Sequence, residues 1–245
     1  MRTALVTGAS RGIGAAIARG LAADGYRIAV NYHSREADAK ALCRELQQIA
    51  GLPHILVRAD VSDRSQVESM FHTIGEVDVL VNNAGIAQQK LFTDLTEADW
   101  DRMFDVDVKG VFHCCQLALP HMIHQKSGAI VNISSMWGQV GASCEVHYSA
   151  AKAAVIGFTK ALAKELGPSH IRVNCIAPGV IDTEMNALLG AETLEALREE
   201  TPLELLGSPI HIADAVRFLV SDRASFITGQ VRRERRHGYL KGKAA

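Results

Sequence analysis

Residues 7–14 read Thr-Gly-Ala-Ser-Arg-Gly-Ile-Gly and join a short apolar run to an alanine-rich stretch with helical periodicity. Glycines at this spacing permit a tight turn and let the backbone approach a pyrophosphate, which then sits on the positive end of the helix. By itself the string also fits an ordinary glycine-rich turn. Its position between an expected strand and an expected helix favours nucleotide binding. The residues expected to contact a cofactor here are Gly8, Ser10, Arg11, Gly12, Ile13 and Gly14.

Short apolar runs and helical segments alternate along the whole chain. Strands are expected at residues 3–7, 27–32, 54–59, 77–81, 129–133 and 171–176. Helices are expected between them at residues 13–24, 36–50, 65–74, 100–125 and 148–166. The runs are continuously apolar, which suits strands buried on both faces of a parallel sheet. We therefore predict a single α/β domain, a Rossmann-like doubly wound parallel sheet with helices on both faces.

Composition narrows the class of protein. A length of 245 residues and an apolar share of 48% suit one globular domain. No window approaches the roughly 18 consecutive apolar residues of a membrane span, and the first strand is expected within two residues of Met1. A cytoplasmic protein is therefore predicted. The five cysteines lack Cys-x-x-Cys spacing, and His121 with His124 lacks a third ligand, so no metal site is expected.

The C-terminal segment differs in charge from the rest of the chain. Residues 232–245 hold six arginines and lysines and one acid, a net charge of +5, so the preceding residues carry −6 of the total −1. An acidic body argues against nucleic-acid binding. After Val231 the chain becomes rich in arginine, and burying such a run without partners is prohibitive. We predict a folded domain over residues 1–231 and a solvated basic tail over residues 232–245.

The end of the second expected strand indicates which nicotinamide cofactor is bound. An acidic residue there would hold the ribose 2′-hydroxyl of NAD(H) and repel a 2′-phosphate. Residues 30–35 read Val-Asn-Tyr-His-Ser-Arg, with no carboxylate before Glu36. Arg11 and Arg35 are candidates to face a phosphate, which favours NADP(H), although a solvated loop position is an equal alternative for Arg35. Asn31 is also assigned to the cofactor site.

Two further strand ends extend the expected cofactor site. Asp60 and Val61 follow the third strand, where the carboxylate is a candidate acceptor for an adenine amino group. The fourth strand is followed by Asn83-Ala84-Gly85, whose small side chains leave room for a flat ring and a ribose. A helix cap or a turn is the alternative explanation for both segments.

Ser135, Tyr148 and Lys152 form the candidate catalytic group. Ser135 follows the fifth expected strand, and the spacing of Tyr148 and Lys152 places them on one face of a helix. A phenol with an ordinary pKa near about 10 exchanges protons poorly at neutral pH, and a nearby ammonium lowers that pKa. Tyr-x-x-x-Lys alone is common by chance. Its combination with the glycine turn and the upstream serine is much more specific.

Five strings together resemble the short-chain dehydrogenases/reductases, in particular the bacterial 3-oxoacyl-[acyl-carrier-protein] reductases. They are TGASRGIG, NNAG, NISS, YSAAK and IAPGVIDT, in the expected order. The resemblance implies that Tyr148 donates a proton to the developing alkoxide and that Ser135 orients the substrate carbonyl. It implies that Lys152 lowers the pKa of Tyr148 and holds the nicotinamide ribose. The other contacts it implies are Pro178, Gly179 and Ile181 at the nicotinamide and Thr183 at the phosphates.

Residues 104–110 depart from the pattern of that family. Its members usually carry an asparagine that supports a water chain to the lysine, and the matching position here is Asp107. An ionised aspartate accepts hydrogen bonds but cannot donate them, so the proton relay is expected to be rewired or to need a protonated Asp107. Asp107 is therefore assigned to the catalytic residues together with Ser135, Tyr148 and Lys152, and a purely structural role is the alternative.

Two segments are expected to cover the substrate. Residues 184–208 resemble the substrate lid of that family, and Trp137 follows the carboxyl end of the fifth strand. Core packing is the alternative for the lid leucines, which are Leu188, Leu189, Leu194 and Leu205.

Three functions are considered. The first is NADPH-dependent reduction of a 3-oxoacyl group on acyl carrier protein. The second rests on residues 134–146, which resemble a branch that reduces the 5-aminopentanone modification on elongation factor P. There Glu145 would face an ammonium, or else be a solvated loop carboxylate. The third is a non-catalytic, nicotinamide-binding regulatory protein, motivated by Asp107 and the tail and opposed by the intact catalytic group.

A homo-oligomer is also expected. Helices over residues 108–123 and 150–166 carry more apolar surface than one sheet face needs, and the resemblance implies a four-helix contact across a two-fold axis. The resemblance also implies an apolar seventh strand after Val231, which the arginines are expected to truncate here. The second interface that it implies, through residues 210–220 and this strand, would gather arginines, which repel one another. A dimer or a weakened tetramer is therefore predicted.

Overall fold

The computed structural model describes residues 1–184, 191–199, 201 and 203–234, and its core is a single parallel sheet. The strand order is β3-β2-β1-β4-β5-β6-β7, which winds outward in both directions from the centre. The predicted fold class is confirmed. The strands are β1 (Thr3–Val6), β2 (Arg27–Tyr32), β3 (Ile55–Arg58), β4 (Val79–Asn82), β5 (Gly128–Ile133), β6 (Ile171–Pro178) and β7 (Val231–Glu234).

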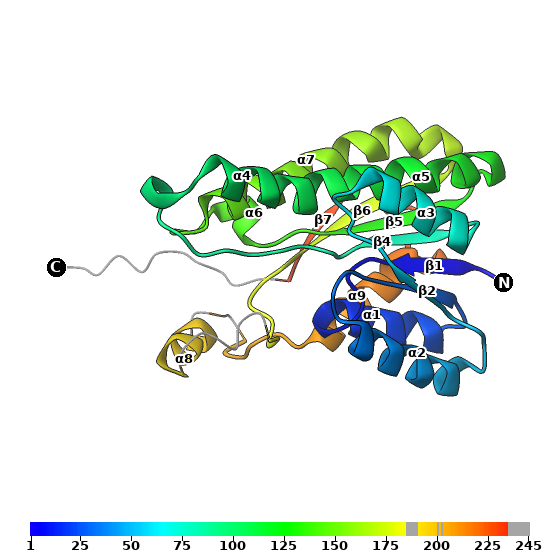
Figure 1. Ribbon diagram of the computed structural model, residues 1–245, viewed down its shortest axis with the longest axis horizontal. Coiled ribbons are helices and arrows are strands. Elements are labelled where there is room, and N and C mark those ends of the chain that lie inside the picture. Colours follow the sequence, from blue (N-terminus) through cyan, green and yellow to red (C-terminus); the bar gives the residue numbers. More distant parts are fainter. Residues whose placement is uncertain (185–190, 200, 202, 235–245) are drawn as a thin grey trace.

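Helices lie on both faces of the sheet (Figure 1). In the described residues they are α1 (Gly12–Ala23), α2 (Glu36–Ala50), α3 (Arg64–Ile74), α4 (Glu97–Phe104), α5 (Gly110–Gln125), α6 (Trp137–Val140), α7 (Val146–Leu166), α8 (Ala191–Glu199) and α9 (Pro209–Val220). Helices α1, α2 and α9 cover one face, and α3, α5 and α7 cover the other. Strand β1 serves both layers, since Ala4 and Val6 join the first apolar cluster and Leu5 joins the second. This two-sided burial is the reason for the continuously apolar strands.

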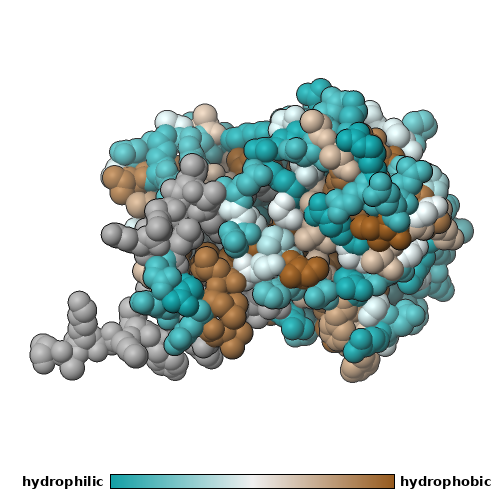
Figure 2. All heavy atoms as spheres, turned by 90° about the horizontal axis from the view of Figure 1, so that it is seen from below, coloured by the Kyte–Doolittle hydropathy of each residue, from teal (hydrophilic) through white to brown (hydrophobic). Residues whose placement is uncertain are grey.

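The outer surface of the α1, α2 and α9 layer is polar. Seen from that side, hydrophilic residues predominate and hydrophobic ones form separate patches (Figure 2). The apolar stripes of these helices therefore face the sheet. Within the part of the chain that the structure describes, none of the helices has the length and apolar character needed to cross a membrane.

The long helix predicted over residues 100–125 is interrupted by a π-helical turn. Helix α4 ends at Phe104, the segment Asp105–Lys109 is π-helical, and α5 begins at Gly110. Single π-helical turns inside α-helices are frequently found at functional sites. The π-helical turn carries Asp107, which is buried behind the end of β4.

The seventh strand ends later than predicted. Strand β7 is short, as expected, but it pairs Val231–Glu234 in parallel with residues 175–178 of β6. Three residues assigned to the tail, 232–234, therefore belong to the sheet. An edge strand needs only backbone hydrogen bonds on one side, and Arg232 is exposed, so the charge need not be buried. The remaining tail, residues 235–245, lies outside the described residues.

Candidate active site

A cavity of about 770 Å³ follows the carboxyl ends of the strands, where doubly wound sheets bind their ligands. Ser135, Tyr148 and Lys152 line it, and so does every residue assigned to the cofactor from the sequence. Asp107 is the one assigned residue that does not form part of the wall. The assigned cofactor residues on the wall are Gly8, Ser10, Arg11, Gly12, Ile13, Gly14, Asn31, Asp60, Val61, Asn83, Ala84, Gly85, Tyr148, Lys152, Pro178, Gly179, Ile181 and Thr183.

The glycine-rich turn forms a bare backbone surface at the start of α1. Gly8 has a φ of 62°, in the left-handed region that favours glycine. A Cβ at Gly14 would lie 2.5 Å from the carbonyl oxygen of Gly8, so a larger residue does not fit there. Asn83 braces the turn, since its Nδ2 donates to the carbonyl oxygens of Thr7 and Gly8 at 2.9 and 3.1 Å. The turn therefore fits a pyrophosphate resting on a helix N-terminus.

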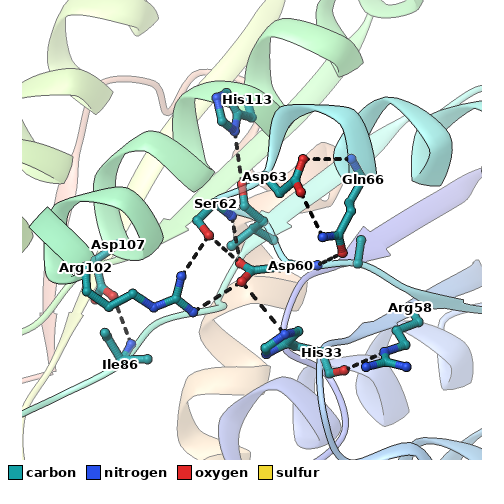
Figure 3. Close-up of polar contacts among 12 residues, drawn as sticks. His33, Arg58, Asp60, Ser62, Asp63, Gln66, Ile86, Arg102, Asp107 and His113 are labelled. Atoms are coloured by element: carbon teal, nitrogen blue, oxygen red, sulfur yellow. Dashed lines mark hydrogen bonds and ion pairs between the residues drawn. The ribbon is translucent and has the colours of Figure 1, made fainter.

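Asp60 is the centre of a polar cluster beside the ends of β2 and β3 (Figure 3). Its Oδ1 accepts hydrogen bonds from the backbone N–H and the hydroxyl of Ser62, at 2.9 and 2.6 Å. Its Oδ2 lies 3.2 Å from Nη2 of Arg102 and 3.8 Å from Nε2 of His33. Burial raises the pKa of Asp60, but the Ser62 hydrogen bonds and the Arg102 charge together lower it. The side chain of Asp60 thus stabilises the turn after β3, and the N-terminus of α3 is capped by a different residue, Asp63. The contact of Asp60 with an adenine stays a prediction.

Two arginines converge on the side of the cavity where a 2′-phosphate is expected. Arg11 and Arg35 both line the cavity, and both side chains are about half-exposed, so the solvated alternative for Arg35 stays open. Both also contact one carboxylate oxygen, Oε2 of Glu184. It lies 2.5 Å from Nη1 of Arg11 and 3.3 Å from Nη2 of Arg35.

The candidate catalytic residues meet in another part of the cavity. Ser135 follows β5, whereas Tyr148 and Lys152 lie one turn apart on α7. The Nζ of Lys152 lies 5.5 Å from the centre of the Tyr148 ring. It also donates to the carbonyl oxygen of Ile133, at 3.3 Å, which fixes the ammonium beside the end of β5. A phenol, an ammonium and a hydroxyl therefore face one space.

Asp107 stands directly behind Lys152. Its Oδ2 lies 2.9 Å from Nζ of Lys152, and both side chains are almost completely buried. Its Oδ1 accepts a hydrogen bond from the backbone N–H of Ile86, at 2.8 Å (Figure 3). A Cβ at Gly85 would lie 2.9 Å from Asp107 Oδ2 and 3.1 Å from Lys152 Nζ, so glycine leaves room for the pair. Asp107 lies outside the cavity wall and contacts two residues that form it, Lys152 and Ile86.

This buried ion pair changes the expected electrostatics. Burial by itself lowers the pKa of Lys152, but the Asp107 carboxylate, followed by Tyr148, raises it to about 12. The pKa of Tyr148 is raised by burial; Lys152 lowers it, and Asp107 raises it again. Lys152 lowers the pKa of Tyr148 as expected, but the rise caused by burial is larger, so the net pKa of Tyr148 is raised. Asp107 therefore offsets part of the charge that would activate the phenol.

Replacing Asp107 with asparagine is expected to lower the pKa of Tyr148, because a negative charge that opposes Lys152 is removed. Ketone reduction needs the protonated phenol, so its rate should begin to fall at a lower pH than in the wild type. Alcohol oxidation needs the phenolate and should become at least roughly threefold faster near pH 8. Rate profiles against pH in both directions measure this. Profiles that coincide with the wild type would contradict the assigned role of Asp107.

Glu145 lines the cavity at the start of α7. It is half-buried, and its Oε2 is buried without a hydrogen-bond partner among the described residues. Burial raises the pKa of its carboxyl group, and a hydrogen bond with Gln89 opposes that rise. The alternative of a solvated loop carboxylate does not match this environment.

The match to known proteins agrees with the site. Residues 2–193 match the short chain dehydrogenase family. The chain belongs to this family. This short-chain dehydrogenase is 44% identical over 233 residues to 3-oxoacyl-[acyl-carrier-protein] reductase FabG of Staphylococcus aureus strain Mu50, and the match covers 94% of each chain.

Two further comparisons span nearly the whole short-chain dehydrogenase. Uncharacterized oxidoreductase YmfI of Bacillus subtilis strain 168 is 42% identical over 231 residues, which cover 94% of this chain and 96% of YmfI. The crystal structure of 3-oxoacyl-[acyl-carrier protein] reductase from Brucella melitensis superposes with a TM-score of 0.90 at 37% identity. That superposition covers 95% of this chain and 89% of the other. The predicted family resemblance is confirmed.

Some site residues of this short-chain dehydrogenase were not predicted. Arg102 and Glu184 reach the cavity by pairing with residues far away in sequence, and no local motif marks them. Gln88 is held by Asp99 at 2.9 Å and by His147 at 3.0 Å, and it also lines the cavity.

The predicted lid lies partly outside the described residues. Leu188, Leu189 and the side chain of Leu194 fall there, whereas Leu205 is exposed and Leu197 of α8 lines the cavity. Among the described residues, no cluster of three or more histidine, cysteine, aspartate or glutamate side chains is arranged to hold a metal ion.

Proposed function

We propose that this short-chain dehydrogenase uses NADPH to reduce a ketone to an alcohol, converting 3-oxoacyl-[acyl-carrier-protein] to 3-hydroxyacyl-[acyl-carrier-protein]. The observation that carries the proposal is a single cavity with Ser135, Tyr148 and Lys152 in one part and Arg11 and Arg35 in another. The S. aureus and B. melitensis proteins are named for reduction of 3-oxoacyl-[acyl-carrier-protein], which supports this substrate class.

The residues of the cavity fit a nicotinamide cofactor and divide the chemistry among them. The bound cofactor supplies the hydride. The bare turn from Gly8 to Gly14 would hold the pyrophosphate, and Lys152 the nicotinamide ribose.

The catalytic group then handles the carbonyl and its proton. Ser135 orients the carbonyl, and Tyr148 donates its proton to the carbonyl oxygen as that oxygen becomes an alkoxide. The Lys152 ammonium stabilises the phenolate that remains. Asp107 holds Lys152 in place and is a positioning residue, not a catalytic one.

NADPH is expected to bind at least about tenfold more tightly than NADH, a difference of about 1.4 kcal/mol. The reason is that Arg11 faces the 2′-phosphate and no acid at the end of β2 repels it. Titration of both cofactors by protein fluorescence measures the difference. Arg11→Ala should remove most of it, whereas Arg19→Ala, in an exposed pair with Glu45 outside the cavity, should not. Equal affinities in the wild type would remove the argument from Arg11.

The substrate is tested by comparing two ketones under the same conditions. NADPH oxidation is measured with acetoacetyl-[acyl-carrier-protein] and with elongation factor P carrying 5-aminopentanone. If the proposal holds, kcat/KM is higher for the acyl-carrier-protein substrate. A kcat/KM that is tenfold or more higher for modified elongation factor P would show that this protein, and not the acyl-carrier-protein thioester, is the substrate.

Glu145 favours a second candidate, reduction of the 5-aminopentanone modification on elongation factor P. Its buried Oε2 lacks a donor, and an ammonium on the substrate would supply one, whereas an unpaired buried carboxylate is costly. On this alternative, Glu145→Gln should lower kcat/KM for modified elongation factor P about tenfold through KM and leave the NADPH affinity unchanged.

A non-catalytic regulatory role is the weakest alternative. It predicts that cofactor binds and that neither ketone is reduced. The complete group of Ser135, Tyr148 and Lys152 argues against it. A cytoplasmic location, and no nucleic-acid or membrane partner, also belong to the proposal.

We further propose a homo-oligomer assembled through α5 and α7. These helices expose apolar residues that a partner would cover, including Phe112, Ile123 and Val146 at 44%, 46% and 39%. A dimer through this face is expected, with any tetramer weakened by the arginines near β7 and strengthened by salt, which screens their repulsion.

Light scattering at low and high ionic strength tests this assembly, on the full chain and on a chain ending at Glu234, which keeps β7 intact. A tetramer that is insensitive to salt in the full chain would show that the arginines lie outside the interface.

A further inference from the structure

A single carboxylate occupies the place where the two cofactor-facing arginines meet. Glu184 Oε2 contacts Arg11 at 2.5 Å and Arg35 at 3.3 Å. Arg11 belongs to the glycine-rich turn, Arg35 to the loop between β2 and α2, and Glu184 to the segment after β6. All three line the same cavity. Glu184 takes no part in the proposed transfer of the hydride or of the proton.

The backbone just before Glu184 is held by hydrogen bonds to Gly207 and lies beside the glycine-rich turn. The Asp182 N–H donates to the Gly207 carbonyl oxygen at 2.7 Å, and the Gly207 N–H donates to Val180 at 2.9 Å. A Cβ at Gly12 would lie 3.8 Å from the methyl group of Thr183, so Thr183 stands beside the turn. Glu184, the next residue, is thereby held within reach of both guanidinium groups.

An anion at this place competes with any other anion that needs the same two cations. A 2′-phosphate must either displace the carboxylate, which costs both ion pairs, or bind beside it against like-charge repulsion. Each route weakens the binding of a phosphate-bearing ligand. NADH carries no 2′-phosphate, so its binding leaves the two pairs in place.

We infer that Glu184 reduces the preference of this enzyme for NADPH by competing with the 2′-phosphate for Arg11 and Arg35. Glu184 lowers the affinity for NADPH and leaves the affinity for NADH nearly unchanged. It therefore narrows the difference in affinity between the two cofactors. The inference rests on the proposed function, because it takes the arginine pair as the 2′-phosphate site. The side chains are about half-exposed, at 43% for Arg11, 46% for Arg35 and 61% for Glu184. Solvated pairs of this kind are weak, so the effect is a modest factor.

Glu184→Gln is the test, because glutamine keeps the size of the side chain and removes its charge. NADPH and NADH are titrated by protein fluorescence against the full-length wild type, Glu184→Gln and Glu45→Gln. Glu45 is a matched control, an exposed glutamate paired with Arg19 at 2.8 Å outside the cavity. We expect Glu184→Gln to tighten NADPH about threefold to tenfold and to change NADH less than about twofold. The Glu45 variant should change neither affinity.

The same titrations in Arg11→Ala/Arg35→Ala separate this inference from the cofactor assignment. In that background Glu184→Gln should change the NADPH affinity less than about twofold, since the cations that it frees are absent and only a solvent-screened repulsion is relieved. If Glu184→Gln leaves NADPH unchanged or weakens it while the double arginine variant loses NADPH affinity, the competition is overturned and the assigned phosphate site stands. If the double arginine variant keeps its NADPH affinity, the assigned site fails and the inference fails with it.

Discussion

Tyr148→Phe is expected to lower the rate of ketone reduction at least about 10³-fold and to change the NADPH affinity less than about twofold. The lost hydroxyl donates its proton only as the carbonyl oxygen becomes an alkoxide, so its contribution belongs to the transition state. The ring that remains still fills the wall of the cavity beside Lys152. Steady-state rates with a saturating ketone, together with cofactor titration, measure both quantities.

Tyr26→Phe is the matched control. Tyr26 is a buried tyrosine outside the cavity wall, so its variant should reduce the ketone at the wild-type rate. If Tyr148→Phe kept wild-type turnover, Tyr148 would not be the proton donor.

Lys152→Met should lower the free energy of unfolding by about 3–5 kcal/mol, because it leaves a buried carboxylate without its cation. The Asp107 and Lys152 side chains are 0% and 6% exposed, so water cannot replace the lost partner. The variant should also lose activity, since the ammonium that stabilises the phenolate is gone. Chemical denaturation followed by circular dichroism gives the change in stability.

The double variant Asp107→Asn/Lys152→Met separates the ion pair from packing. It removes the stranded charge and should recover at least half of the lost stability. Lys160→Met, an exposed lysine on the same helix, should change stability little. A double variant as unstable as Lys152→Met would show that the buried charge is not the cause.

The ion pair also gives stability a defined dependence on pH. The pKa of Lys152 rises from its ordinary 10.5 to about 12 in the folded protein. A folded pKa above the unfolded one means that the contribution is complete below about pH 10.5 and is lost as the pH rises through about 12. Lys152→Met should therefore differ most from the wild type at neutral pH.

Much of the fold and of the cavity wall could be predicted because both follow from local patterns. Strands buried on both faces are continuously apolar, and β2 and α2 begin and end where the sequence indicates. Parallel strands bring their carboxyl ends to one edge, so residues just after each strand, such as Asp60 and Ser135, had to meet there.

The parts that were not predicted depend on contacts between distant residues. Arg11 and Glu184 are 173 positions apart, and nothing local to either residue signals their pairing. The π-helical turn at Asp107 interrupts a segment whose apolar residues have α-helical spacing, and that spacing does not reveal a single turn of different geometry. Strand β7 accepts arginines because it lies at the edge of the sheet, a position that composition does not reveal.

A single turnover of the full-length protein, preloaded with NADPH, shows whether the site performs the proposed chemistry. Acetoacetyl-[acyl-carrier-protein] is added with enzyme in excess, and the loss of reduced nicotinamide absorbance is followed in the wild type and in Tyr148→Phe. We predict one 3-hydroxyacyl product for each NADPH consumed in the wild type, and a rate at least about 10³-fold lower in the variant. Wild-type protein that binds NADPH but consumes none with this ketone or with modified elongation factor P, or equal rates in both proteins, would contradict the assigned reaction and its proton donor.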